Sequence, residues 1–164
     1  MPETFRVTTR TQPVQIHFGA GEVTVGEVFL HGAVGTHLGE ETVLDVVNEA
    51  SPFFPVLVGA PRQRTLLVAK SQVRYVRFPR TVSSRAPALG SELALEVQCD
   101  DGALLTGTTI VDLRPGSQRT LDFMNSTLTG FFALSESEHD VLINRCHVRH
   151  VCDVIPSSPS KPNV

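Results

Sequence analysis

The sequence predicts a mainly β protein in which one small β-barrel module occurs twice, with one short helix in each copy. Three observations support this prediction. Apolar residues and glycines recur in the same order in two stretches of the 164-residue chain. Short alternating strands are bounded by turn residues, and each copy holds one segment of helical spacing. A doubled module constrains the architecture more closely than the chemistry.

The repeat runs over residues 14–76 and 95–151. The matched positions are Val14, Ile16, Gly21 and Gly26 with Leu95, Val97, Gly102 and Gly107; Leu44–Asn48 with Leu121–Asn125; Phe53 and Phe54 with Phe131 and Phe132; Leu67 with Leu142; and Val73–Val76 with Val148–Val151. We therefore predict a first β module (1–78), a linker rich in Arg, Ser, Pro and Gly (79–93), a second β module (94–155) and a disordered tail (156–164). Each module alone buries little surface, so we expect the two to pack into one body with pseudo-twofold symmetry.

Each copy begins with a predicted hairpin. Alternating apolar residues lead into Gly19-Ala20-Gly21 in the first copy and into Asp100-Asp101-Gly102 in the second. Asp-Gly between such residues is a strong hairpin signal, because glycine adopts a positive φ without strain. Gly26 and Gly107 then interrupt the second strand of each copy. They predict a bulge or sharp bend of the kind that curls a small sheet into a barrel.

The middle of each copy, residues 42–50 and 119–127, fits a short helix capped by Thr42 or Thr120. A tight connection between strands would also accommodate its Asp and Asn residues. A phenylalanine pair opens the third strand, and β-rich runs close the copies at 65–76 and 141–151. The parity of the apolar residues shifts within these runs, which predicts a β-turn at Lys70-Ser71 and at Arg145-Cys146.

The sequence resembles two known families, one through two motifs of the second copy and the other through a segment found in both copies. Val97-Gln98-Cys99-Asp100-Asp101-Gly102, followed by Gly107 and Asp122-Phe123-Met124-Asn125, is similar to the first motif of the Sm-like proteins, and Asn144-Arg145-Cys146-His147-Val148 is similar to their second. This resemblance implies partly open, SH3-like or Sm-like small β-barrels and RNA binding. Leu44–Asn48 and Leu121–Asn125, each before a Phe-Phe pair, also resemble short bacterial domains of unassigned function with a Leu-x-Asp-x-Leu-Asn-type segment. That second resemblance implies no reaction.

Composition and charge narrow the function. The chain has 14 Lys and Arg against 17 Asp and Glu, a net charge of -3, which argues against a protein built around phosphate neutralisation. It has no apolar run long enough to span a membrane and no signal-peptide pattern at its start. The odd set of cysteines, Cys99, Cys146 and Cys152, indicates a reduced, cytoplasmic protein.

Cys146-His147-x-x-His150-x-Cys152 offers thiolates and imidazoles, which suit zinc. On an extended strand, Cys146, His150 and Cys152 face one side and do not converge on a tetrahedral ion. We therefore predict no metal and no other cofactor. Because the sequence also lacks a nucleophile elbow and a phosphate-binding loop, we predict that the protein is not an enzyme.

A basic cluster lies around Tyr75 and Phe78. Its members are Lys70, Arg74, Arg77, Arg80 and Arg85. Arginines between aromatic residues bind nucleic acid or an acidic partner, or else form a solvated strand end. Arg74 and Arg149 occupy matched positions, and we expect them to pair with Asp45 and Asp122.

These features predict a non-catalytic adaptor or regulatory subunit that binds another protein at exposed strand edges, with a homodimer as one arrangement. The candidate binding residues are Asp45, Asn48, Phe53, Phe54, Arg74, Tyr75, Asp122, Asn125, Phe131, Phe132 and Arg149. The Asp and Asn residues either tie down local backbone or form a polar binding edge. The phenylalanines are either core residues or apolar anchors. The alternatives are a Sm-like RNA-binding protein and a sensor that binds a small molecule between the copies.

Overall fold

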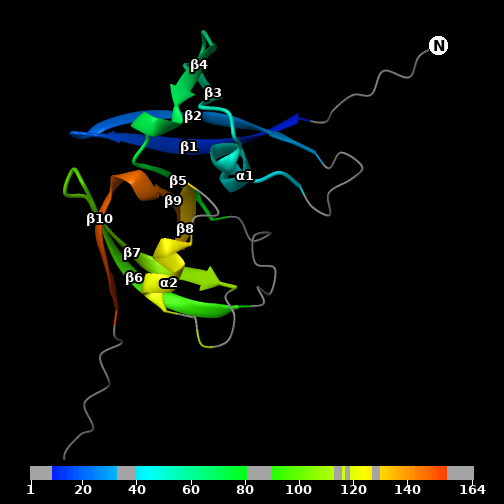
Figure 1. Ribbon diagram of the computed structural model, residues 1–164. Coiled ribbons are helices and arrows are strands. Elements are labelled where there is room, and N and C mark those ends of the chain that lie inside the picture. The colour runs from blue at the N-terminus through cyan, green and yellow to red at the C-terminus, as the bar shows by residue number, and fades with distance from the viewer. Residues whose placement is uncertain are drawn as a thin grey trace, which may run out of the picture.

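The computed structural model describes residues 9–32, 40–80, 90–112, 116, 119–126 and 130–154 (Figure 1). The first half of the chain comprises β1 (Thr9–Gly19), β2 (Glu22–His31), α1 (Val43–Asn48), β3 (Phe53–Val58), β4 (Arg64–Ala69), the 3-10 helix η1 (Lys70–Gln72) and β5 (Tyr75–Pro79). The second half comprises β6 (Ser91–Cys99), β7 (Leu104–Val111), α2 (Thr120–Asn125), β8 (Phe131–Ser135), β9 (His139–Asn144), the 3-10 helix η3 (Arg145–His147) and β10 (Val148–Asp153). The protein is thus mainly β, as predicted.

All ten strands belong to one antiparallel sheet, in the order β10-β6-β7-β8-β9-β5-β1-β2-β3-β4. The prediction of two SH3-like or Sm-like β-barrels is therefore wrong. Closing a barrel would require the two outer strands of each half to pair with each other. Instead, β5 of the first half pairs with β9 of the second, from Tyr75↔Ile143 to Pro79↔His139. The sheet stays open, and β4 and β10 form its two ends (Figure 1).

The two halves have the same order of elements and the same strand registers. The matched pairs are Gln15↔Val25 with Glu96↔Thr106, His17↔Tyr75 with Gln98↔His150, Glu27↔Leu57 with Thr108↔Ser135, and Phe53↔Ala69 with Phe131↔Asn144. We call residues at the same place in the two halves counterparts. Phe53 and Phe131 are counterparts by this definition, as are Leu67 and Leu142.

The junction between the halves joins strands that are not counterparts. The counterpart of β9 is β4, and the counterpart of its partner β5 is β10. A pseudo-twofold axis would bring identical edges together. The prediction of pseudo-twofold symmetry is therefore wrong, and the halves are joined head to tail.

Each half has its own apolar core, and each core receives side chains from the other half. The first core, built on Val14, Ile16 and Val28, also contains Phe131 and Leu142 of the second half. The second core, built around Leu95 and Val97, contains Tyr75 of the first half. This exchange of large side chains ties the halves into one body.

Gly26 and Gly107 are counterparts with one shared role. A Cβ at Gly26 would lie 2.6 Å from the Leu57 carbonyl oxygen, and one at Gly107 would lie 2.4 Å from the Ser135 carbonyl oxygen. The β1–β2 register continues through Gly26 without a shift. These glycines therefore permit close approach of neighbouring backbones, and the predicted bulge at this point is wrong.

The predicted helices and turns coincide with observed helical elements. α1 and α2 lie inside the segments predicted as helical, and the 3-10 helices η1 and η3 lie where β-turns were predicted. β5 ends at Pro79 and β6 begins at Ser91, while 81–89 of the predicted linker and the predicted tail, 156–164, lie outside the described residues. None of the helices in the described ranges is long and apolar enough to cross a membrane.

Candidate protein-binding edges

The junction between β5 and β9 shows how this fold buries one strand edge against another. Phe131 of β8 is 3% exposed and Leu142 of β9 is 1% exposed. Both side chains enter the first core, which also contains Val43 and Val47 of α1 and Val76 of β5. The apolar face of α1 and β5, the outermost strand of the first half, thus form a receptor for two side chains of the second half.

Asn48, at the end of α1, holds the backbone of the inserted strand. Its side-chain Nδ2 donates to the Phe131 carbonyl oxygen at 3.1 Å, and its Oδ1 accepts from the Phe131 N–H at 2.8 Å. Both bonds are part-buried, so neither backbone group of Phe131 is left unpaired away from water. The Asn48 candidate is therefore a clamp within the molecule.

A polar cluster flanks the same junction. The Arg74 guanidinium lies 2.6 Å from Asp100 and 3.7 Å from Asp101, and the two ring nitrogens of His147 lie 2.8 Å from the Asp100 carboxylate and from the Ser71 carbonyl oxygen. The hydrogen bonds from His147 and then from Arg74 hold the pKa of Asp100 below its ordinary value, because they favour its charged form. Asp100 therefore remains ionised and links the β6–β7 turn to the first half.

The predicted pairing of Arg74 with Asp45 and of Arg149 with Asp122 is wrong. Asp45 closes a capping box with Thr42 at the start of α1. Arg149 donates to the Asp100 carbonyl oxygen at 3.0 Å. Short-range capping satisfies Asp45 without a partner from a distant strand.

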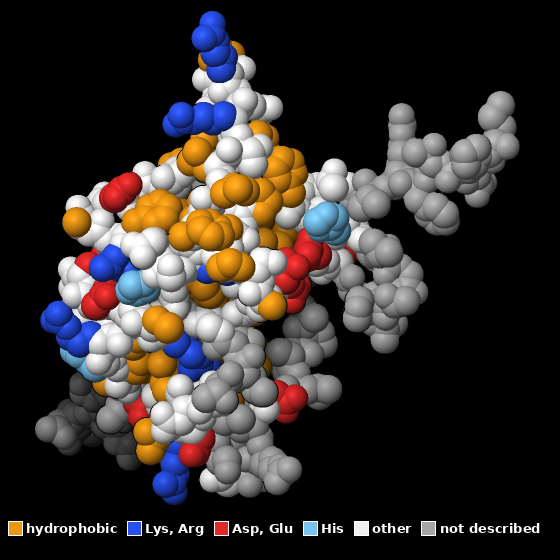
Figure 2. All heavy atoms as spheres, turned by 45° about the horizontal axis from the view of Figure 1, so that its top comes forward, with side chains coloured by type: hydrophobic (Ala, Val, Ile, Leu, Met, Phe, Trp, Pro, Cys, Tyr) orange, Lys and Arg blue, Asp and Glu red, His pale blue; other side chains and the backbone are white. Residues whose placement is uncertain are grey.

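The β4 edge has no strand beside it among the described residues, and it exposes apolar side chains. Phe53 is 52% exposed and Leu67 is 71% exposed, although their counterparts Phe131 and Leu142 are buried. Pro55, exposed as well, lies opposite Leu67 in the β3–β4 register. Figure 2 shows hydrophobic side chains gathered over this part of the molecule, next to basic side chains at the end of the hairpin.

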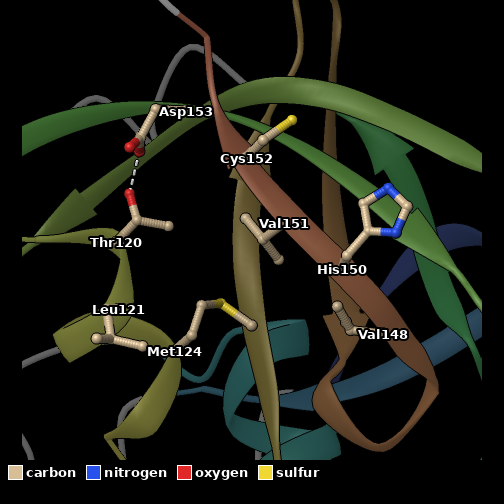
Figure 3. Close-up of a pocket in the computed structure, with 8 residues that line it drawn as sticks. All are labelled: Thr120, Leu121, Met124, Val148, His150, Val151, Cys152 and Asp153. Carbon is tan, nitrogen blue, oxygen red and sulfur yellow. Dashed lines mark hydrogen bonds between the residues drawn. The ribbon is translucent and has the colours of Figure 1, made fainter.

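The β10 edge is equally unpaired within the described part of the chain, and it borders a pocket of about 380 Å³. The pocket lies between α2 and β10 (Figure 3), and it is lined by Thr120, Leu121, Met124, Val148, His150, Val151, Cys152 and Asp153. Leu121 is 67% exposed at its rim. A hydrogen bond from Thr120 to Asp153 crosses one end of it. The pocket is thus an apolar hollow beside a free strand edge.

The other candidate residues fall into the core or onto the surface. Phe54 and Phe132 are buried in the first and the second core. Tyr75 is buried and stacks on His17 with ring centroids 4.1 Å apart. Asn125 is exposed at the end of α2, and Asp122 is half-buried in its first turn.

The described members of the basic cluster bind groups within the protein. Lys70 donates to the Glu49 carbonyl oxygen at 2.7 Å, Arg77 pairs with Glu136 at 2.9 Å, and Arg80 pairs with Asp140 at 3.3 Å. Arg85 lies outside the described residues. Their charge is therefore already balanced by carboxylates and carbonyl oxygens of this chain.

The cysteines and histidines form no metal site of three or more ligands within the described ranges. Cys99 is fully buried, and burial raises the pKa of its thiol to about 11. A thiol with such a pKa is protonated at neutral pH and is a poor nucleophile.

No protein-family model, curated protein or solved structure matches this chain. The two edges therefore rest on their own geometry. Sequence reasoning missed Leu67, Leu121 and Met124. A signal for Leu67 was present, because the consecutive Leu66-Leu67-Val68 places an apolar side chain on both faces of β4.

Proposed function

We propose that this protein is a non-catalytic adaptor or regulatory subunit that binds another polypeptide by strand addition at the β4 edge. The observation that supports this most directly is the exposure of Phe53 and Leu67, 52% and 71%, next to a strand edge that pairs with no other described strand. Their counterparts on β8 and β9 are buried in the first core, against α1 and the strand that pairs with β9. The β4 edge therefore has the same hairpin register and the same outward Phe and Leu as an edge that already binds a strand.

Strand addition supplies both affinity and selectivity. Unpaired N–H and C=O groups of β4 form the backbone ladder, and the outward side chains select the partner. Burial of Phe53 and Leu67 provides apolar area at the centre of such an interface, where large side chains contribute most to binding. Proteins rarely leave an apolar strand edge of this kind bare.

RNA is a weaker candidate for the partner. Binding to single strands needs a basic groove with aromatic faces. Arg74, Arg77 and Arg80 are engaged with Asp100, Glu136 and Asp140. Phe53, an exposed aromatic residue, lies on β3 beside aliphatic side chains instead.

The test is affinity capture of the tagged protein from its own cells, with and without nuclease. We expect a protein held in constant proportion to the tagged chain, unaffected by nuclease, with untagged copies of this chain counted as a partner. Leu67→Lys should remove that protein, because a charge would then lie in the buried interface. Ile110→Lys is the matched control, since Ile110 is 51% exposed on β7 and distant in the sheet order from β4.

Two results would contradict the proposal. The first is capture of the same partners by the Leu67→Lys variant as by the unaltered chain. The second is a set of partners that disappears on nuclease treatment, which would favour RNA binding.

A further inference from the structure

We propose that the polypeptide bound at the β4 edge is a second copy of this chain. β4 of one copy pairs with β10 of the next, and Phe53 and Leu67 enter the pocket between α2 and β10. This inference rests on the proposed function and specifies its partner. It follows from a comparison between the junction inside the molecule and the two free edges.

The junction provides the template for the contact. Within one chain, β9 pairs with β5, and Phe131 and Leu142 are buried against α1 and β5. The free edge β4 is the counterpart of β9, and the free edge β10 is the counterpart of β5. The two ends of one molecule are therefore the two components of the junction, each without its partner.

The side chains that would insert have matched positions. Phe131 lies opposite Asn144 and Phe53 opposite Ala69, so both aromatic residues begin the equivalent strand in the same register. Leu142 and Leu67 lie at the centre of β9 and β4. Only the pair at the junction is covered.

The pocket corresponds to the receptor at the junction. The first core contains Val43, Leu44, Val46 and Val47 of α1, Val76 and Phe78 of β5, and Val73 just before β5. Their counterparts are Thr120, Leu121, Phe123, Met124, Val151, Asp153 and Val148. All of these line the pocket except Phe123, which packs against the second core (Figure 3). The pocket is thus the empty form of a receptor that is filled in the first half.

The backbone clamp also has a counterpart. Asn48 binds both backbone groups of Phe131, and Asn125 lies at the same place on α2 with an exposed side chain. In the assembled form, Asn125 would bind the backbone of Phe53 of the neighbouring copy. The clamp would make the position of Phe53 specific, since it satisfies one donor and one acceptor together.

The register at the junction fixes the register between copies. Val76 lies opposite Leu142 and Phe78 opposite Asp140, which places Val151 opposite Leu67 and Asp153 opposite Thr65. Directly opposed residues of a ladder project to the same face of the sheet. Val151 and Leu67 would therefore lie together on one face of the joined sheet, as Val76 and Leu142 do in the first core.

A head-to-tail contact leaves one free edge of each kind at the ends of the assembly. Such contacts produce closed rings or open filaments rather than simple symmetric dimers. We therefore expect the chain to form species larger than a dimer as its concentration rises.

The test uses analytical ultracentrifugation of the full chain and of two surface variants. Leu67→Lys alters only the β4 edge, and Leu121→Lys alters only the rim of the pocket. Both residues are largely exposed, so we expect both variants to fold. Each variant alone should self-associate at least about tenfold more weakly than the unaltered chain, because a charge enters an apolar contact. Each should therefore be monomeric at concentrations where the unaltered chain assembles.

An equimolar mixture of the two variants provides the decisive measurement. The Leu121→Lys chain retains its β4 edge and the Leu67→Lys chain retains its pocket, so one intact contact can form between them. The mixture should sediment as a dimer and no further. Recovery limited to a dimer distinguishes a head-to-tail contact from a symmetric one, which mixing would not restore.

A cross-link tests the register independently. Arg77 lies opposite Val141 at the junction, so the native Cys152 should lie opposite Leu66 of the next copy. In a Cys146→Ser background, Leu66→Cys should form a disulfide between chains when an added oxidant removes two electrons and two protons from the thiols. Cys152→Ser should abolish the cross-link. A species that forms equally without Cys152 would contradict the register.

The inference is overturned if the unaltered chain remains monomeric up to its highest soluble concentration. It is also overturned if Leu121→Lys leaves association unchanged, or if the mixture fails to form a dimer. The proposed function survives such a result if Leu67→Lys still abolishes capture of a different protein. Both fail if Leu67→Lys changes neither association nor capture.

Discussion

The β3–β4 hairpin and the β8–β9 hairpin are nearly the same structure in different surroundings. Their registers are identical, and each carries a Phe-Phe pair and a central Leu. Phe131 and Leu142 are almost fully buried, whereas Phe53 and Leu67 are more than half exposed. The difference arises from the strand next to the hairpin: β9 has β5 beside it, and β4 ends the sheet. Whether these Phe and Leu side chains are buried therefore depends on which strand lies beside the hairpin, and not on the local sequence.

The helices differ in the same way. α1 begins with a capping box from Thr42 and Asp45, and it buries Val43, Val46 and Val47. α2 follows Arg119, has no side-chain cap and has no buried residue. Arg145 donates instead to the carbonyl oxygens of Phe123 and Met124 at its end. Phe123 and Met124 of α2 pack against the second core, while Leu121 remains 67% exposed at the rim of the pocket.

The largest expected effect compares the two central leucines. In a monomeric Leu121→Lys background, Leu142→Ala should lower the free energy of unfolding by about 3 kcal/mol, since it leaves a cavity in the first core. Leu67→Ala should lower it by less than about 0.5 kcal/mol, because this side chain is exposed in the monomer. Urea denaturation measures both. Equal losses for the two variants would show that the hairpins do not differ as described.

The second comparison concerns the two asparagines. Asn48→Ala should cost about 2 kcal/mol of unfolding free energy, because it leaves the part-buried backbone groups of Phe131 without partners. Asn125→Ala should change stability by less than about 0.5 kcal/mol in the same monomeric background. Asn48→Asp retains the acceptor and loses the donor, so it should fall between wild type and Asn48→Ala. A larger loss from Asn125→Ala than from Asn48→Ala would contradict the assignment of the clamp.

Much of the local structure could be predicted from the sequence. The turn at Asp101-Gly102, the two short helices and the matched positions of the halves follow from patterns within a few residues of each other. The breaks at Lys70 and Arg145 were visible as a shift in apolar parity, although both are 3-10 helices rather than β-turns. Local backbone preferences and side-chain alternation suffice for features of this kind.

The joining of the halves could not be predicted. Leu142 and Leu67 have similar neighbours along the chain, so no local pattern distinguishes the buried one from the exposed one. Asp100 also pairs with Arg74, which is 26 positions away. Which edges meet depends on the complementarity of two completed surfaces, and the sequence alone shows neither surface. The prediction of two partly open β-barrels failed for this reason.

The third comparison concerns the matched arginines. Arg74→Ala should lower the unfolding free energy by about 1 kcal/mol, because it removes a charge-assisted contact with Asp100 that is only partly exposed. Arg149→Ala removes one exposed hydrogen bond to a carbonyl oxygen and should cost less than about 0.5 kcal/mol. A double-mutant cycle of Arg74→Ala and Asp100→Asn measures the coupling. The absence of coupling would place the effect of Arg74 in its packing over Gly19.

The smallest expected effect concerns His17 and its counterpart Gln98. His17 stacks on Tyr75, and burial, together with the nearby Arg77, lowers the pKa of its imidazole below its ordinary value of 6.5. The unfolded chain therefore binds a proton at His17 before the folded chain does, so stability from this residue falls as the pH drops from 6.5 toward the lowered pKa. His17→Gln copies the second half and removes that titration. The two proteins differ at no other position, so the difference between their stability curves isolates His17. A difference that stays constant between pH 7 and about pH 4 would show that the folded protein does not disfavour the charged imidazole.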